Sequence, residues 1–363
     1  MRTSHIKKAF RILNFKPLAT FIVLYTWLYI SINYITDRNK LKIGVVFLKF
    51  YKIYIIFKER LHKEKLLDSE KVRDLVVRIE SRMRGDLPME CNKIEIDNIP
   101  SYNLNNALVS IVIPTKNRFD DLLEPCLDSI ISKSTYNNYE IVIVDNGSDQ
   151  YNKRWIYNYM NNHADYIIRS LDYDTDEYNY AAIHNYAIPK CAGEYVIMLN
   201  NDTEVIEPTW IEQLVGPMID SQFGIVGAKL LYRDHHIQHC GVVYNEKVKS
   251  FYHIHCGECD QIEDSNEYKI FPAVTGACIA FEKQMFINLG GMDENLAVAY
   301  NDIDLCMKVR KHGHRILYSP YARLYHYESK SRGYDTTFEK QMIEYVERLY
   351  FLQKWGDFVN VSC

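Results

Sequence analysis

The clearest pattern along the chain is a set of short apolar runs separated by longer stretches in which apolar residues recur at helical spacing. The short runs are typical of strands buried on both faces of a sheet. Because strands alternate with helices, the pattern predicts an α/β fold with a mostly parallel sheet and helices on both faces. The expected strands are residues 109–113, 140–144 and 195–199, and the expected helices are residues 119–131, 153–160 and 180–188.

The run at residues 195–199 ends abruptly in three polar residues, Asn200, Asn201 and Asp202. Ligands of open α/β sheets bind beyond the carboxyl ends of the strands, and a carboxylate flanked by amides can hold a divalent cation that binds phosphate. A capped turn that begins the next expected helix, residues 208–218, explains the same residues without a ligand. The stretch alone favours neither interpretation.

Polar side chains also follow the first two expected strands, at Thr115 and Asn117 and at Asp145. Together along one edge, they predict a nucleotide site in which a carboxylate accepts a hydrogen bond from a base imide. For Asp145 alone, an Asx-turn is the commoner explanation. The loop at residues 114–118 contains no glycine, and the chain has no Gly-Lys-Ser or Gly-Lys-Thr motif. Dinucleotide oxidoreductases and P-loop NTPases are therefore disfavoured.

A second polar cluster lies downstream, where a glycine-rich turn at residues 290–294 precedes Asp302 and Asp304 at the start of an expected helix. Carboxylates there satisfy free backbone N–H groups, so helix capping is one interpretation. One acid suffices for a cap, and a second is left for proton abstraction. His326 follows an expected strand at residues 315–318 and is a candidate metal ligand with Asp202, although a single histidine is more often structural.

Charge is distributed unevenly along the 363 residues, whose net charge is −4. Residues 1–65 contain 14 Lys or Arg and 3 Asp or Glu, which leaves 29 basic and 44 acidic residues for the rest. A basic end on an acidic body disfavours nucleic acid as a partner of the body. It fits an N-terminal segment held at an anionic membrane surface.

Two apolar runs lie in this basic segment. Residues 17–36 reach the ~20 residues that span a bilayer. Residues 43–57 are interrupted by Lys49 and Lys52 on one helical face, which is typical of an amphipathic helix in the membrane interface. We expect residues 1–65 to be helical and membrane-associated, with the main domain on the cytoplasmic face; whether the first run spans the bilayer stays open. The expected division of the remainder is a charged helix and linker at 66–106, the main domain at 107–335 and a C-terminal helix packed on it at 336–363.

Cysteine usage indicates the redox environment. The nine cysteines are odd in number and several lie inside apolar runs, which predicts reduced thiols in a cytosolic compartment. Residues 253–259 contain two His and two Cys, which are zinc-type ligands. The pairs adjoin each other and no second Cys-x-x-Cys exists, so zinc is the minority interpretation.

The ordered set of motifs resembles family 2 glycosyltransferases, in particular bacterial enzymes of O-antigen, capsule and related surface-glycan assembly. The resemblance extends over residues 108–355. Its motifs are residues 110–118 (SIVIPTKNR), 140–148 (EIVIVDNGS), 199–203 (LNNDT), 274–278 (VTGAC), 290–293 (GGMD), 301–305 (NDIDL) and 325–333 (YHYESKSRG).

This resemblance implies a GT-A, Rossmann-like fold and an inverting transfer from a UDP-, dTDP- or GDP-sugar to a glycan or lipid-linked acceptor, with Mg²⁺ or Mn²⁺. By position, Asp302 is the expected general base with Asp304 as the second candidate, and Asp202 and His326 are the expected metal ligands. The expected nucleotide-binding residues are Pro114, Thr115, Asn117, Arg118, Asp145, Asn179, Asn185, Asn200 and Asn201, and the expected acceptor or sugar pocket contains Gly276, Gln238 and His239.

Two departures from the family pattern keep alternatives open. Asn200 stands where the metal motif usually has its first Asp, and Asn301 stands where a Glu usually precedes the base. A non-catalytic sugar-binding or scaffold protein of the same fold is therefore an alternative. A nucleotidyltransferase is another, although such enzymes typically carry a glycine-rich basic loop after the first strand.

Overall fold

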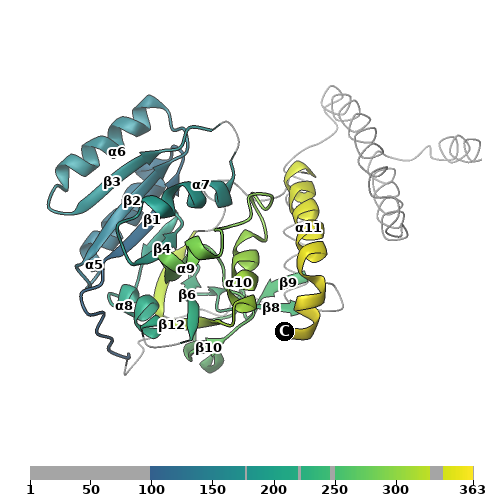
Figure 1. The fold of residues 1–363 in the computed structure, drawn as a ribbon. Helices are drawn as coiled ribbons and strands as arrows, with labels where there is room; N and C mark the ends of the chain where they lie inside the picture. Colours follow the sequence, from purple (N-terminus) through teal and green to yellow (C-terminus); the bar gives the residue numbers. More distant parts are fainter. Residues whose placement is uncertain (1–98, 176–177, 220–221, 246–249, 328–337, 363) are drawn as a thin grey trace, which may run out of the picture. The chain divides into compact units, whose positions relative to one another are not determined.

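The computed structural model describes residues 99–175, 178–219, 222–245, 250–327 and 338–362 (Figure 1). The expected membrane-associated segment at residues 1–65 lies outside these residues, as does most of the expected linker. Among the described residues, no helix combines the length and apolar character needed to cross a bilayer.

The first half of the sheet is parallel. Strand β1 (Val109–Thr115) lies between β2 (Tyr139–Asp145) and β4 (Tyr195–Leu199), and β3 (Ile167–Asp172) pairs with the outer side of β2. The chain runs from β1 outward to β3 and then returns to the other side of β1 with β4. Strand order therefore reverses between β1 and β4, and such a switch point leaves a crevice for a ligand at the carboxyl ends of the strands.

The second half of the sheet is mixed. Strand β11 (Cys278–Glu282) is antiparallel to both β4 and β6 (Phe223–Leu231), and β12 (Arg315–His326) pairs parallel with β6. The strand order is β10-β12-β6-β11-β4-β1-β2-β3. Three short strands join antiparallel: β10 (Lys269–Ile270) and β5 (Thr203–Val205) on β12, and β7 (Ile237–His239) on β6.

The expectation of a mostly parallel sheet is thus right for β1 to β4 and for the β6–β12 pair, and wrong for β11 and the short strands β5, β7 and β10. After residue 231, short strands follow one another without crossover helices, and such connections favour antiparallel pairing. The expectation of helices on both faces is confirmed. One face carries η2 (Phe119–Leu123), α5 (Glu124–Lys133), α6 (Gln150–Asn162) and α8 (Trp210–Val215), and the other carries α7 (Tyr180–Ala187), α9 (Lys283–Asn288), α10 (Asn301–Lys311) and α11 (Phe338–Ser362).

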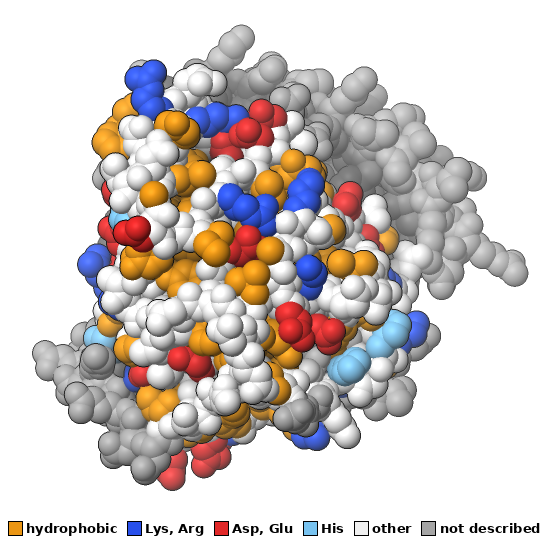
Figure 2. Space-filling model, turned by 60° about the vertical axis from the view of Figure 1, so that its left-hand side comes forward, with side chains coloured by type: hydrophobic (Ala, Val, Ile, Leu, Met, Phe, Trp, Pro, Cys, Tyr) orange, Lys and Arg blue, Asp and Glu red, His pale blue; other side chains and the backbone are white. Residues whose placement is uncertain are grey.

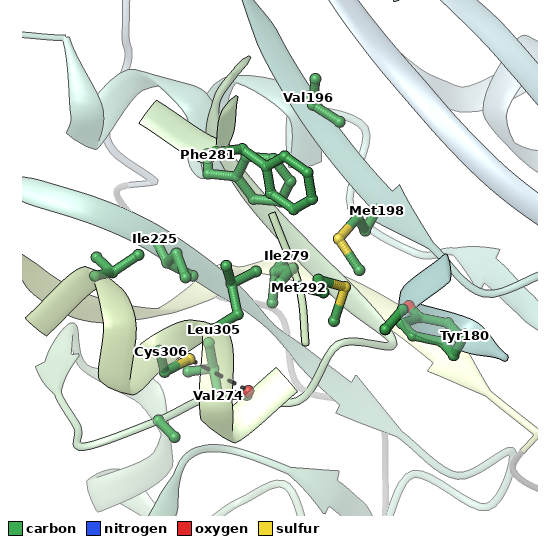
Figure 3. Packing of buried hydrophobic residues seen from close by; sticks show 14 of the residues in the cluster. Tyr180, Val196, Met198, Ile225, Val274, Ile279, Phe281, Met292, Leu305 and Cys306 are labelled. Carbon is green, nitrogen blue, oxygen red and sulfur yellow. Dashed lines mark hydrogen bonds between the residues drawn. The ribbon is translucent and has the colours of Figure 1, made fainter. Parts of the chain in front are cut away.

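Each face of the sheet has its own hydrophobic cluster, because alternate side chains of a strand point to opposite faces. In β1, Ile111 and Ile113 belong to one cluster and Val112 to the other. Figure 3 shows part of the second cluster, in which Leu305 and Cys306 of α10 pack with residues of β6 and β11. Burial of each such side chain contributes about 1.5–3 kcal/mol, and this packing fixes α10 against the sheet.

Smaller elements complete the described chain. Three short 3₁₀ helices and a separate hairpin of two strands lie outside the main sheet. These elements are η3 (Ile188–Lys190), η4 (Gly216–Met218), η5 (Glu263–Asn266), β8 (Val242–Asn245) and β9 (Ser250–His253). On the face shown in Figure 2, basic, acidic and hydrophobic side chains are interspersed.

Candidate active site

The switch point brings together polar side chains from β1 and β4. Thr115, the last residue of β1, accepts a hydrogen bond from the Asn201 amide at 3.1 Å between Nδ2 and Oγ1. The Thr115 carbonyl accepts from the Asn146 backbone N–H at 2.8 Å. The side chains of Thr115 and Asn201 are buried. The strand ends that the sequence grouped into one nucleotide site are therefore neighbours.

The loop after β1 is shaped by two consecutive left-handed residues, Asn117 (φ 55°) and Arg118 (φ 57°). Residues other than glycine adopt this conformation at a cost of about 1–2 kcal/mol. Hydrogen bonds from neighbouring segments hold the loop: the Asn117 N–H donates to Ser148 Oγ at 2.7 Å, and Asn117 Oδ1 accepts from the Asp149 N–H at 2.9 Å. Pro114, also expected in the nucleotide site, is buried in β1 beside Val144.

Asp145 combines a structural contact with a free acceptor. Its Oδ1 accepts from the Ser148 N–H at 3.0 Å, which is the Asx-turn considered from the sequence. Its Oδ2 is buried without a hydrogen-bond partner among the described residues and lies 3.6 Å from Lys153 Nζ. The ammonium also contacts Asp172 and Asp174 at 3.2 Å each, and these carboxylates raise the pKa of Lys153. Sequence reasoning missed Lys153, which carries no motif.

Asp202 and His326 lie side by side because β5 pairs with the end of β12. Asp202 does not cap a helix: the next residue, Thr203, begins β5 and pairs with His326. The Tyr327 N–H donates to the Asp202 carbonyl at 2.9 Å. His326 Nε2 lies 3.3 Å from Asp202 Oδ1 and 3.3 Å from Asn200 Nδ2.

This pair fits a divalent cation. Asp202 Oδ1 is buried and has no hydrogen-bond partner among the described residues, although His326 Nε2 is close. Two cis ligands of an octahedral ion with bonds of about 2.1 Å lie about 3 Å apart, which is close to the 3.3 Å separation. Within the described residues, no three His, Cys, Asp or Glu side chains form a metal-binding group. Asp202 and His326 thus offer two ligands, and Mg²⁺ or Mn²⁺ commonly takes its others from substrate phosphates and water.

Asp302 is half-buried in the first turn of α10. Its Oδ2 accepts from the Gly276 N–H and its Oδ1 from the Ile303 N–H, both at 2.8 Å. A Cβ on Gly276 would meet Asp302 Cβ at 3.1 Å. Gly276 therefore acts as a close backbone partner of the carboxylate.

The loop between β10 and β11 contacts both the backbone of the segment that carries Asp202 and the carboxylate of Asp302. The Asn200 N–H donates to the Ala277 carbonyl at 2.9 Å, and the next residue towards the N-terminus, Gly276, binds Asp302. Tyr180 donates its hydroxyl to the Gly276 carbonyl at 2.8 Å. Burial raises the pKa of Tyr180, and the charges of both Asp302 and Asp202 add to the rise. The sequence did not single out Tyr180.

Asp304, the second candidate base, occupies a different setting. It is fully buried, its Oδ1 accepts from Trp355 Nε1 at 2.7 Å, and Lys354 Nζ lies 2.6 Å from the same oxygen. Lys308 Nζ lies 3.7 Å from Oδ2. A carboxylate held between two ammonium groups under a helix cannot reach an acceptor hydroxyl. We therefore remove Asp304 from the candidate bases.

Asn179 and Asn185, which were expected in the nucleotide site, make structural hydrogen bonds in the folded chain. Asn179 Oδ1 caps α7 through the Ala182 N–H at 3.0 Å, and its Nδ2 donates to the Glu294 carbonyl at 2.8 Å. Asn185 exchanges hydrogen bonds with the Met292 backbone in both directions, at 2.8 and 3.0 Å. These amides join α7 to the glycine-rich turn and leave little capacity for a nucleotide.

Gln238 and His239 are both buried. His239 lies beside Thr275, in the loop between β10 and β11. His239 Nε2 lies 3.4 Å from the Thr275 N–H nitrogen, and its Nδ1 lies 3.4 Å from His253 Nδ1. Burial lowers the pKa of His239 well below its usual range, with smaller effects from His253 and His326. A neutral His239 that accepts from Thr275 supports the loop that carries Gly276.

The His and Cys residues at 253–259 do not converge on a metal. His255 contacts Glu258 and Asp264 at 3.3 and 3.1 Å. Cys259 is disulfide-bonded, which departs from the expectation of reduced thiols at this residue. Six other described cysteines form no disulfide, and of these six Cys256 is the exposed one.

Comparison with known proteins agrees with the fold and motifs. Residues 110–290 match the profile of glycosyl transferase family 2. The chain therefore belongs to this family, and its fold is of the GT-A-like α/β type.

Two curated relatives are similar to this chain. The uncharacterized protein y4gI of Sinorhizobium fredii (strain NBRC 101917 / NGR234) is 37% identical over 255 residues, which are 68% of this chain and 27% of that protein. The O-antigen biosynthesis protein RfbC of Myxococcus xanthus is 32% identical over 231 residues, which are 62% of this chain and 18% of that protein. The chain thus matches about a quarter or less of each relative.

A crystal structure of GalNAc-T7 with UDP, GalNAc and Mn²⁺ has a similar fold. It aligns with a TM-score of 0.57 at 17% identity and covers 71% of this chain and 50% of that one. At this identity the similarity shows the fold alone.

Proposed function

We propose that this protein is an inverting glycosyltransferase that moves a sugar from a nucleotide-diphosphate sugar to a hydroxyl of a glycan or lipid-linked acceptor. The observation that carries the proposal is that one loop contacts both the segment that carries Asp202 and Asp302 itself, by the Asn200–Ala277 and Gly276–Asp302 hydrogen bonds. In this proposal, Asp202 as a metal ligand and Asp302 as the base face one crevice at the switch point.

In this proposal, Thr115, Asn117, Arg118 and Asp145 bind the nucleotide. Asp145 Oδ2 is the buried free acceptor that a base imide N–H requires. Arg118, whose pKa is raised by Asp121 and, to a smaller extent, by Asp202, brings positive charge towards the metal side of the site. We infer a UDP-, dTDP- or GDP-sugar, since uracil, thymine and guanine all present an N–H donor beside a carbonyl.

Asp202 and His326 would hold Mg²⁺ or Mn²⁺, which offsets the charge that develops on the leaving diphosphate. Asp302 accepts the proton of the acceptor hydroxyl while that oxygen forms the new bond to C1 of the sugar. The bond from C1 to the phosphate oxygen breaks on the opposite face, and the nucleoside diphosphate leaves. The Gly276 N–H keeps the Asp302 carboxylate oriented.

Two neighbours support this class of substrate without defining it. GalNAc-T7, which has a similar fold, was crystallised with UDP, GalNAc and Mn²⁺. RfbC, part of which is similar to this chain, is an O-antigen biosynthesis protein. We accordingly infer a place in surface-polysaccharide synthesis, with the N-terminal segment on the membrane and the described domain on its cytoplasmic face.

The test is release of nucleotide from a panel of sugar nucleotides, with and without Mn²⁺, for the wild type and two variants. Asp302→Asn should keep donor binding within about twofold and lose transfer by about 10²-fold or more. Asp202→Ala should weaken Mn²⁺-dependent donor binding instead. Metal-dependent binding without turnover in the wild type would support the sugar-nucleotide-binding protein, and normal turnover in Asp302→Asn would remove the proposed base.

A further inference from the structure

The C-terminal helix α11 contacts the segment that leads into the proposed base. This base segment, defined here as residues 293–304, contains the turn before α10 and the first turn of α10. Figure 1 shows α11 running beside α10. The helix lies beyond residue 290, where the family match ends, and nothing in the proposed chemistry has used it so far.

One carboxylate of α11 binds three successive backbone N–H groups of the base segment. Glu347 accepts from Ala297 at 3.0 Å, from Val298 at 3.2 Å and from Ala299 at 2.6 Å. Its side chain is buried, with 6% of its surface exposed. Hydrogen bonds from N–H groups to a carboxylate are stronger than those between neutral groups, so this contact fixes the backbone just before α10.

Two residues further along α11, Lys354 and Trp355, contact the two ends of the base segment. Lys354 Nζ lies 2.7 Å from Asp293 Oδ2 and 2.6 Å from Asp304 Oδ1. The Trp355 indole donates to Asp304 at 2.7 Å. Residues 354 and 355 come seven and eight positions after residue 347, so they lie on the same face of the helix as Glu347.

Between these contacts lies a strained residue. Tyr300 has φ 61°, in the left-handed region, and precedes α10 without a side-chain cap. Its ring packs on Phe351 of α11 with the centroids 5.3 Å apart. Strained backbone of this kind persists where surrounding contacts define it. Asp302 follows two residues later, so the direction of its carboxylate depends on this turn.

We propose that Glu347 is a positioning residue for the base: by binding the N–H groups of residues 297–299, it fixes the turn that directs Asp302 at the acceptor hydroxyl. This inference rests on the proposed function. It assigns to α11 a part in catalysis, through contacts that none of the motifs at residues 110–305 supplies.

The experiment compares Glu347→Ala and Glu347→Gln with Glu344→Ala in the full chain, at a temperature well below unfolding. Glu344 is exposed on the same helix and is the matched control. For Glu347→Ala, kcat should fall by about tenfold or more, because small displacements of reacting groups cost up to about 10²-fold, and the donor KM should change less than about twofold. Glu347→Gln keeps one acceptor oxygen and should restore part of kcat, and Glu344→Ala should match the wild type.

Amide hydrogen exchange supplies a readout that does not need transfer. Exchange at residues 297–304 should rise in Glu347→Ala while exchange in β1 stays as in the wild type. Wild-type kcat in Glu347→Ala, or unchanged exchange at residues 297–304, would overturn the positioning role. Failure of the proposed function has a different signature: the wild type then transfers no sugar, while the exchange comparison still decides whether Glu347 fixes the turn.

Discussion

The substitution Asn200→Asp tests the metal pair most sharply, because it restores the carboxylate that the family pattern has at this position. Asn200 Nδ2 and Asp202 Oδ1 each lie 3.3 Å from His326 Nε2, so the two side-chain atoms are at most 6.6 Å apart. Two carboxylates at this separation repel by about 2.5 kcal/mol at an effective dielectric constant of about 20. Asn200 is half-buried, so solvent screening reduces the expected loss to about 1–2.5 kcal/mol.

Without metal, Asn200→Asp should therefore lower the free energy of unfolding, measured by urea denaturation in the presence of a chelator. With Mn²⁺ the sign should reverse, since a second anionic ligand strengthens cation binding. Each tenfold gain in affinity adds about 1.4 kcal/mol at saturating ion. The control is Asn201→Asp. The Asn201 amide donates to Thr115, and Mn²⁺ should not restore the stability that this variant loses. Equal Mn²⁺ affinity in Asn200→Asp and the wild type would refute the assignment of this pair as metal ligands.

Two further predictions concern acid stability and the membrane. Burial lowers the pKa of His184 to about 4, below its unfolded value of about 6.5, so this residue stabilises the fold above pH ~6.5 and the contribution is lost as the pH falls towards 4. The loss reaches about 3 kcal/mol at about 1.4 kcal/mol per pH unit. The free energy of unfolding in urea should therefore depend less on pH for His184→Phe than for the wild type, and parallel curves for the two proteins would contradict this prediction. Deletion of residues 1–65 should move the protein from the membrane fraction to the supernatant after cell lysis, and an unchanged membrane fraction would count against the proposed anchoring.

The parts of the fold that depend on local pattern could be predicted from the sequence. β1, β2 and β4 were identified because buried parallel strands have unbroken apolar runs. β5 was not: Thr203–Val205 is three residues long, and its pairing with β12 is a contact between segments more than a hundred residues apart. The capped turn, one of the two interpretations that the sequence left open at residues 200–202, is therefore wrong, because β5 begins at Thr203.

The candidate site shows the same limit. Asp302 and Asp304 are two positions apart on α10, so they face nearly opposite directions. Which of the two carboxylates can reach an acceptor depends on where Gly276 and Trp355 lie. The spacing of the two residues in the sequence does not give those positions. Asn179 and Asn185 were grouped with the nucleotide site because of the family resemblance. In the structure, both side-chain amides are half-buried and donate hydrogen bonds to the turn at residues 290–294.

The most direct measurement is anomalous scattering from Mn²⁺ in crystals grown with a nucleoside diphosphate. The account predicts one manganese peak bonded to Asp202 Oδ1 and His326 Nε2, with the diphosphate on the ion, the base beside Asp145, and Asp302 facing the terminal phosphate across the crevice. A manganese ion and nucleotide bound away from Asp202, or a nucleotide on a face that Asp302 does not share, would contradict the account.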